Sequence, residues 1–307
     1  MELKEWSLII FTIVMQMAIG SFVILGGVHY FATRRNGMAE ADRMADRSLL
    51  AIGPLVVLAL LVTLLHLGNP LNAPRAISNF GSSWLSREII LAGTFSVLGA
   101  VFAFMQWRKI GSMNVRRVVG LVVALVGLVL VYAMAMIYQL PTVPAWNSPA
   151  TVITFFITTF LLGALAIGAA FVANFTYLRG KKPDKANVQY TMLATTLRWL
   201  ALMAIVLLGL HFVVIPLYLA TLAINPEPAA VASANVIVGQ NGLLLAVRLV
   251  LLFLGAGVFA VFVYKNAASE AKLRVLGSMA YLAFALVLIS EIMGRYLFYA
   301  SMVRVGI

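Results

Sequence analysis

Long apolar segments recur along this chain and are separated by short connectors that are rich in polar or turn-forming residues. Several of these segments exceed the roughly 18–20 residues that a helix needs to cross the hydrocarbon core of a bilayer. The pattern predicts eight transmembrane helices, near residues 7–32, 48–67, 88–107, 118–139, 150–178, 198–224, 241–264 and 275–299. Only short connectors remain, so we expect one all-α, polytopic integral membrane domain over residues 1–307.

The composition agrees with a membrane protein and excludes a soluble enzyme. Hydrophobic residues make up 63% of the 307 residues and charged residues only 10%, whereas soluble domains are about 45–50% apolar and about 25% charged. The net charge of +12 would indicate nucleic-acid binding in a soluble protein. No segment of this chain combines basic and aromatic residues in a binding pattern, so we expect lipid and not nucleic acid around it.

The basic residues predict the orientation of the helices, because cytoplasmic connectors of membrane proteins carry an excess of Lys and Arg. Fifteen of the 22 basic residues lie in the connectors after the first, third, fifth and seventh helices, whereas the other connectors and both tails together hold four. This bias places both termini on the outer, periplasmic side. The outer connectors 68–87, 140–149 and 225–240 are rich in turn-forming residues, either as ordinary interfacial loops or as a docking face for a partner.

The sequence has no cysteine and only three histidines. The absence of cysteine excludes a disulfide, a catalytic thiol and a Cys-ligated iron–sulfur cluster in this protein. His29, His66 and His211 fall near the inner end of the first helix, the outer end of the second and the middle of the sixth. No two therefore share the depth that a bis-histidine haem requires, and we expect neither haem nor a metal site.

Ionisable residues inside the predicted helices are the candidates for function, because charged side chains are costly in the hydrocarbon region. Counted at about 1.5 Å per helical residue, five polar residues fall in the outer third of the bilayer: His66, Glu88, Arg248, Glu291 and Arg295. A histidine and carboxylates at the boundary of lipid and water suit proton-coupled chemistry on a membrane-soluble substrate such as a quinol, whose hydroxyl protons need acceptors.

Structural roles for the same residues stay open at the level of sequence. His66 is also explained as an interfacial hydrogen-bonding residue at a helix end. Glu291 and Arg295 are four residues apart and share a helix face, where they can form an ion pair. Arg248 is either a counter-charge for Glu88 or Glu291, or a substrate contact.

Five strings stand in order along the sequence: Glu5-Trp6-Ser7-Leu8, Leu65-His66-Leu67-Gly68-Asn69-Pro70, Ser86-Arg87-Glu88-Ile89, Thr142-Val143-Pro144-Ala145-Trp146 and Glu291-Ile292-Met293-Gly294-Arg295-Tyr296-Leu297-Phe298-Tyr299. Together they resemble the landmarks of the membrane-anchor subunits of bacterial dimethyl sulfoxide reductases (DmsC-like proteins). That family has eight helices with both termini outside. One departure is Asn72, which stands where relatives commonly carry an arginine, so the resemblance assigns no role to the following Arg75.

The resemblance implies a subunit in the bacterial cytoplasmic (inner) membrane. It implies an anchor for two partners on the periplasmic face: a ferredoxin-like, four-cluster iron–sulfur subunit and a molybdopterin catalytic subunit. It also implies oxidation of menaquinol to menaquinone, with His66 as the quinol-site histidine and Glu88 as the linked glutamate. Glu291 and Arg295 match family positions, but their assignment to quinol binding, like that of Arg248, follows from depth alone.

The resulting hypothesis is that menaquinol enters from the lipid between the second, third and eighth helices. His66 accepts a hydroxyl proton, Glu88 assists its release, and electrons pass to the partner's cluster for reduction of dimethyl sulfoxide or a similar acceptor. The alternatives are an anchor for a polysulfide, tetrathionate or nitrite-type reductase, an anchor that reduces quinone, a purely structural anchor and a secondary transporter. Transporters usually carry polar groups at the midplane, where only His211 is expected here.

Overall fold

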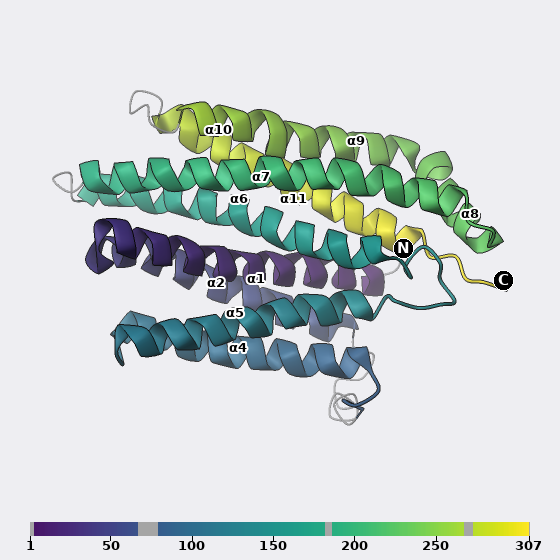
Figure 1. Cartoon of the computed structure of the whole chain (residues 1–307), viewed down its shortest axis with the longest axis horizontal. Coiled ribbons are helices and arrows are strands. Elements are labelled where there is room, and N and C mark those ends of the chain that lie inside the picture. The colour runs from purple at the N-terminus through teal and green to yellow at the C-terminus, as the bar shows by residue number, and fades with distance from the viewer. Residues whose placement is uncertain (1–2, 67–78, 182–185, 267–272, 307) are drawn as a thin grey trace.

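The computed structural model describes residues 3–66, 79–181, 186–266 and 273–306, and this part is helical apart from turns and short connectors (Figure 1). Eight described segments are long and apolar enough to cross a membrane, as predicted. They are α1 (Leu3–Asn36), α2 (Met38–His66), α4 (Trp84–Arg108), α5 (Met113–Met136), α6 (Pro149–Lys181), α7 (Ala186–Ala223), the continuous run of α9 (Gly242–Leu252), η4 (Phe253–Phe259) and α10 (Ala260–Asn266), and α11 (Leu273–Ala300).

Consecutive helices run in opposite directions, so both termini lie at the right-hand end of the molecule in Figure 1. We call this the terminal end; it also carries residues 137–148 and the short helix α8 (Pro228–Asn235). The opposite end carries the junction of α1 and α2, the connector between α4 and α5, the C-terminal end of α6 and the start of α11, with many of the basic residues, and we call it the basic end. That the basic end faces the cytoplasm stays a prediction from the charge bias.

The helices form two bundles of four. Helices α1, α2, α4 and α5 pack together, as do α6, α7, α9–α10 and α11, and the two bundles meet where α1 packs against α6. The backbones approach closely there, because a Cβ atom added to Gly20 would overlap the carbonyl oxygen of Thr159 and one added to Gly163 would overlap the backbone of Gly20. Small residues of this kind let membrane helices gain packing contacts without a hydrophobic driving force.

The helices extend beyond the predicted apolar spans at the basic end. Only Gly37, with a φ of 84°, separates α1 from α2, so α2 begins at Met38 and not near residue 48. The first turns of α2 carry charged side chains that bond to neighbouring helices, including Arg47, which donates to Asn174 of α6 at 3.0 Å. Hydropathy alone misses these turns because their side chains are polar.

The connector at 225–240 is helical and not the loop that its composition predicts. It contains α8 and the π-helical turn η3 (Val236–Gln240). Pro228 stands at the start of α8, where a missing N–H costs nothing, and the alanines after it favour a helix.

Candidate functional site

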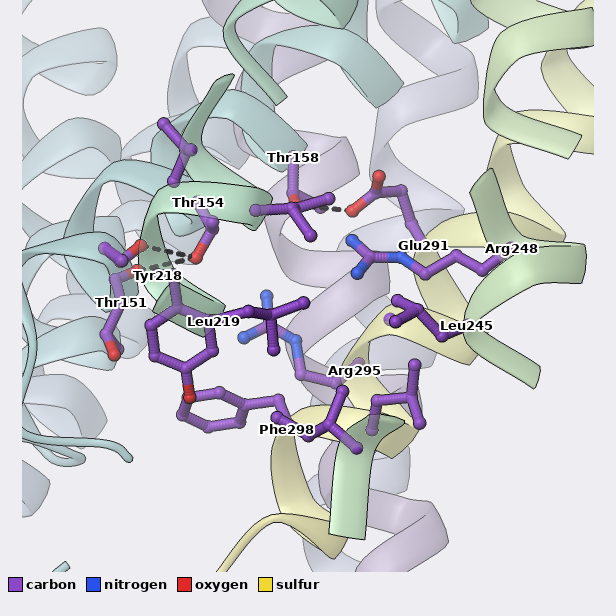
Figure 2. Close-up of a pocket in the computed structure, with 16 residues that line it drawn as sticks. Thr151, Thr154, Thr158, Tyr218, Leu219, Leu245, Arg248, Glu291, Arg295 and Phe298 are labelled. Atoms are coloured by element: carbon purple, nitrogen blue, oxygen red, sulfur yellow. Dashed lines mark hydrogen bonds between the residues drawn. The ribbon is translucent and has the colours of Figure 1, made fainter. Parts of the chain in front are cut away.

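A cavity of about 80 Å³ lies near the terminal end among α6, α7, α9 and α11 (Figure 2). Apolar side chains such as Leu219, Leu245 and Phe298 form part of its wall. The polar lining comes from four helices and consists of Thr151, Thr154, Thr158, Tyr218, Arg248, Glu291 and Arg295. The structure thus brings three of the five residues predicted from sequence around one space.

Glu291 is almost fully buried and has one satisfied oxygen. The Thr158 hydroxyl donates to its Oε2 atom at 2.6 Å. Its Oε1 atom lies 3.6 Å from Nδ1 of His211 and has no hydrogen-bond partner among the described residues. Because a buried carboxylate needs hydrogen bonds to offset its lost hydration, Oε1 is an acceptor available to a ligand.

Arg295 is held by groups from α1 and α6. Its Nη2 atom donates to Oε1 of Gln16 at 2.9 Å, and its guanidinium carbon lies 3.8 Å from the centre of the Phe155 ring. Gln16 is itself fixed by donating to the Phe155 carbonyl at 3.1 Å. The ion pair expected between Glu291 and Arg295 is absent from the ion pairs of the described residues, because Arg295 turns to this amide and ring.

Arg248 lies against the backbone of α11 at Gly294. A Cβ atom on Gly294 would be 2.5 Å from both Nε and Cζ of Arg248, so only glycine leaves room for this guanidinium. Ser290 donates to the Arg248 carbonyl at 3.0 Å, whereas Nε of Arg248 has no hydrogen-bond partner among the described residues. Figure 2 shows the guanidinium groups of Arg248 and Arg295 pointing into the same space, beside the carboxylate of Glu291.

His211 belongs to this group, although its position in the sequence predicts the middle of the membrane. It is fully buried beside Glu291, and neither ring nitrogen has a hydrogen-bond partner among the described residues. Counting residues along a straight helix ignores tilt, which averages about 20° in membrane proteins and shifts depths between helices.

Glu88 lies in the other bundle, near the start of α4, and is 8% exposed. Both Glu88 and Arg295 are within electrostatic range of the Tyr138 hydroxyl, which shares a hydrogen bond of 2.5 Å with the hydroxyl of Tyr299. Glu88 is therefore connected to Arg295, a cavity residue, through the pair of Tyr138 and Tyr299.

His66 is the last residue of α2, and its side chain lies outside the described part of the structure, as do residues 67–78 with Arg75. Helix α11 packs mainly against α1, α6, α9, η4 and α10, whereas α4 packs mainly against α5 and α2. The described contacts therefore place α4 and α11 in different bundles, and the entry of quinol between α2, α4 and α11 stays a prediction.

A search of the sequence for charged residues in apolar spans misses several uncharged polar residues of this region. Gln16 stands alone in the most buried helix, where a lone amide is a signal for a long-range partner. Thr151, Thr154 and Thr158 are spaced by three and four residues and share one face of α6. Tyr218 donates to the Ala145 carbonyl at 2.9 Å and ties α7 to the connector at 137–148.

The chemistry of the cavity is that of a binding place for an oxygen-bearing organic group. Two guanidinium groups and one carboxylate face it, so it offers donors, an acceptor and an excess of positive charge. In the described part of the protein, no group of three or more His, Asp or Glu residues is placed to hold a metal ion.

Comparison with known proteins identifies relatives along the entire sequence. The present sequence is 27% identical to YnfH, an anaerobic dimethyl sulfoxide reductase protein of Escherichia coli K12. The match covers 98% of the present sequence and 96% of that protein. An anaerobic dimethyl sulfoxide reductase protein of Haemophilus influenzae is 24% identical, over 99% of the present sequence and 97% of its own length. One of the sulfite dehydrogenase subunits of Allochromatium vinosum is 29% identical over 49% of the present sequence and 50% of its own length.

A solved structure, that of bd oxidase from Geobacillus thermodenitrificans, has the same fold, with a TM-score of 0.69 over 97% of this protein and 85% of that one. The identity is only 14%, so this likeness concerns the fold alone. The family model of the DMSO reductase anchor subunit (DmsC) matches residues 1–301. This protein therefore belongs to the family of dimethyl sulfoxide reductase anchor subunits.

Proposed function

We propose that this anchor subunit oxidises menaquinol at the outer face of the cytoplasmic membrane and passes the electrons to a partner subunit. Oxidation of one quinol to quinone releases two protons and two electrons. The protons need acceptors in the protein, and the electrons need a redox group. Because the anchor has no cysteine to bind an iron–sulfur cluster, the electrons go to a cluster of the partner, one at a time.

The observation that carries the proposal is the cavity near the terminal end. Arg248 and Arg295 offer donors to the oxygen atoms of a quinone, and Oε1 of Glu291 offers an acceptor to a quinol hydroxyl. A volume of about 80 Å³ is smaller than the roughly 150 Å³ that admits a benzene ring. The cavity therefore receives one oxygen-bearing edge of the head group, and the rest of the ring and the tail stay in the lipid.

The resemblance of the sequence gives a second place for the same chemistry. There His66 accepts or hydrogen-bonds a quinol hydroxyl proton and Glu88 assists its release to the outer side. A buried Glu88 near the terminal end is compatible with this role. We retain both groups of residues as quinol contacts, because the described helices place Glu88 and the cavity in different bundles and an experiment can separate them.

The partners in this proposal dock on the terminal end. A four-cluster, ferredoxin-like iron–sulfur subunit docks on residues 137–148 and α8, and a molybdopterin subunit binds to it and reduces dimethyl sulfoxide or a similar acceptor. If the acceptor is reduced outside, the protons released from the quinol are consumed on the same side and turnover is electroneutral.

The test compares two electron donors on the purified complex. Menaquinol analogues must enter through this subunit, whereas a reduced viologen dye delivers electrons directly to the partners. We expect H66R and E88K, which change proposed proton carriers, to reduce quinol-dependent turnover by about 100-fold to 10,000-fold. R248Q and E291Q should reduce it as well, and all four should leave viologen-dependent turnover unchanged. R108Q, which removes an exposed arginine at the basic end, far from both groups of residues, is the control and should not change either rate.

The pattern of losses also locates the head group. Losses confined to H66R and E88K place it beside α2 and α4, and losses confined to R248Q and E291Q place it in the cavity. Normal quinol-dependent turnover in all four assembled variants would refute the proposed site.

The partial similarity to a sulfite dehydrogenase subunit supports a second candidate function. In that case the partner oxidises a sulfur compound and the anchor reduces quinone to quinol. Co-purification of the partner subunits and a measurement of the direction of electron flow distinguish the two functions.

A further inference from the structure

A second and larger cavity, of about 440 Å³, lies at the basic end among α1, α2, α4 and α5. Its inner wall is apolar and includes Phe22, Leu49 and Phe102. Gly26, Gly27 and Leu121 border it and are exposed, so the cavity opens sideways between α1 and α5. A Cβ atom added to Gly26 or Gly27 would meet nothing within 4 Å, which shows that open space faces these glycines.

A connected network of polar side chains borders this cavity, and three of its members, His29, Asp46 and Gln106, line the cavity wall. Gln106 donates to Asp42 and to Asp46, at 2.9 Å in both cases. Lys109 bridges the same two carboxylates at 2.7 and 2.8 Å, and Nε2 of His29 lies 2.8 Å from Asp42. Two carboxylates and one lysine leave one negative charge, and the addition of Arg116 and Arg117 gives this cluster a net charge of +1 when His29 is neutral.

Arg116 lines the cavity and is 5% exposed, yet it has no carboxylate partner among the described residues. Its Nη1 atom donates to the uncharged amide oxygen of Gln106 at 2.8 Å, and its Nε atom has no hydrogen-bond partner there. The neighbouring Arg117 also lines the cavity, and its guanidinium lies 5.8 Å from the centre of the Tyr30 ring. A buried guanidinium without an anion in contact is costly, and the net positive charge of the cluster can accommodate one further anion.

We propose that this cavity binds an acidic phospholipid. The phosphate accepts hydrogen bonds from Arg116 and Arg117 at the polar mouth, and an acyl tail lies along Phe22 and Phe102. The apolar wall and sideways opening suit a lipid tail, and the unpaired positive charge distinguishes a phosphate from the neutral head group of a quinone. Basic pockets between helices on the cytoplasmic side of membranes bind anionic head groups for the same reason.

The experiment measures lipid bound to the purified complex by quantitative mass spectrometry after delipidation and exposure to phosphatidylglycerol or phosphatidylcholine. Native protein should retain phosphatidylglycerol in preference to phosphatidylcholine. R116Q should lower this retention about fivefold, the effect of one basic residue at an acidic membrane surface. G27L fills the open space with an apolar side chain, keeps every charge and should lower retention by a similar factor.

R108Q is the matched control, because Arg108 is an exposed arginine at the same end that does not line the cavity. It removes the same formal charge and should leave retention unchanged. A thermal shift with inorganic phosphate as large as that with phosphatidylglycerol would overturn the lipid assignment in favour of a free anion. The proposal is also overturned if R116Q and G27L both retain phosphatidylglycerol normally, or if R108Q loses as much as they do.

Discussion

Replacement of Gly294 by alanine tests whether the position of Arg248 matters for quinol turnover. The added Cβ atom would lie 2.5 Å from Nε and Cζ and 2.6 Å from Nη2 of Arg248. To reach an ordinary contact of 3.4 Å, the guanidinium must retreat by 0.9 Å. G294A keeps every charged and polar group of the protein, so its only intended effect is to displace the side chain of Arg248.

The fold should tolerate this change. Alanine in a helix interior is more favourable than glycine by about 0.5–1 kcal/mol, and a strained arginine rotamer costs about 0.5–1.5 kcal/mol. These two effects nearly cancel, and Nε of Arg248 has no hydrogen bond to a described residue that would oppose the movement. In contrast, a catalytic or binding group that is misplaced by about 1 Å can reduce turnover by as much as 100-fold.

We therefore expect G294A to assemble, to unfold within about 1 kcal/mol of the native complex, and to lose about 10-fold to 100-fold of its quinol-dependent turnover. Viologen-dependent turnover reports the integrity of the partners and should not change. G209A is the matched control, since a Cβ atom at Gly209 meets nothing within 4 Å. Native quinol-dependent turnover in G294A, together with a normal control, would refute a role for Arg248 at the cavity.

Three further predictions concern stability, and thermal unfolding of the detergent-solubilised complex checks each of them. G20A should destabilise the junction of the two bundles by about 1–3 kcal/mol, because its Cβ atom overlaps a backbone carbonyl that cannot rotate away; a midpoint equal to that of G209A would contradict this. Y138F should cost about 0.5–1.5 kcal/mol through loss of the hydrogen bond to Tyr299, and Y299F should add little to it, whereas additive losses would show that the pair is not coupled. Q106L should cost about 1–3 kcal/mol, because it leaves Arg116 and two carboxylates without their shared amide; an unchanged midpoint would show that the network at the basic end does not stabilise the fold.

The number and order of the helices follow from the sequence because an apolar run of sufficient length has few alternatives to a membrane span. The partners of polar side chains do not follow in the same way. Arg295 has an acid four residues away, which predicts a local ion pair, yet it bonds to Gln16, 279 positions away. Only the packing of α1 against α11 makes that amide available, and no local rule encodes it.

Charge counting has a similar limit at the basic end. Lys109, Arg116 and Arg117 are correctly read as part of a topology signal, because they belong to a connector rich in basic residues. Once α2 and α4 are packed together, Lys109 and Arg116 also bond to a specific polar network, and Arg116 and Arg117 line a cavity. A basic residue at a membrane interface can therefore help to set the topology and also line a binding cavity. Only its contacts in the folded protein reveal the second role.

Helix length separates the roles of the two cavities. Arg116 and Met136 lie in α5 and are 20 residues apart, which corresponds to about 30 Å along the helix. Electron transfer falls off steeply with distance, and a quinol at Arg116 would need a relay to reach a partner at the terminal end. The anchor has no cysteine for a cluster, and His29, His66 and His211 stand in different helices without a matched pair among the described side chains. Under the proposed function, redox chemistry therefore belongs to the terminal end, and an anion that does not react is the better explanation for the unpaired arginine at the basic end.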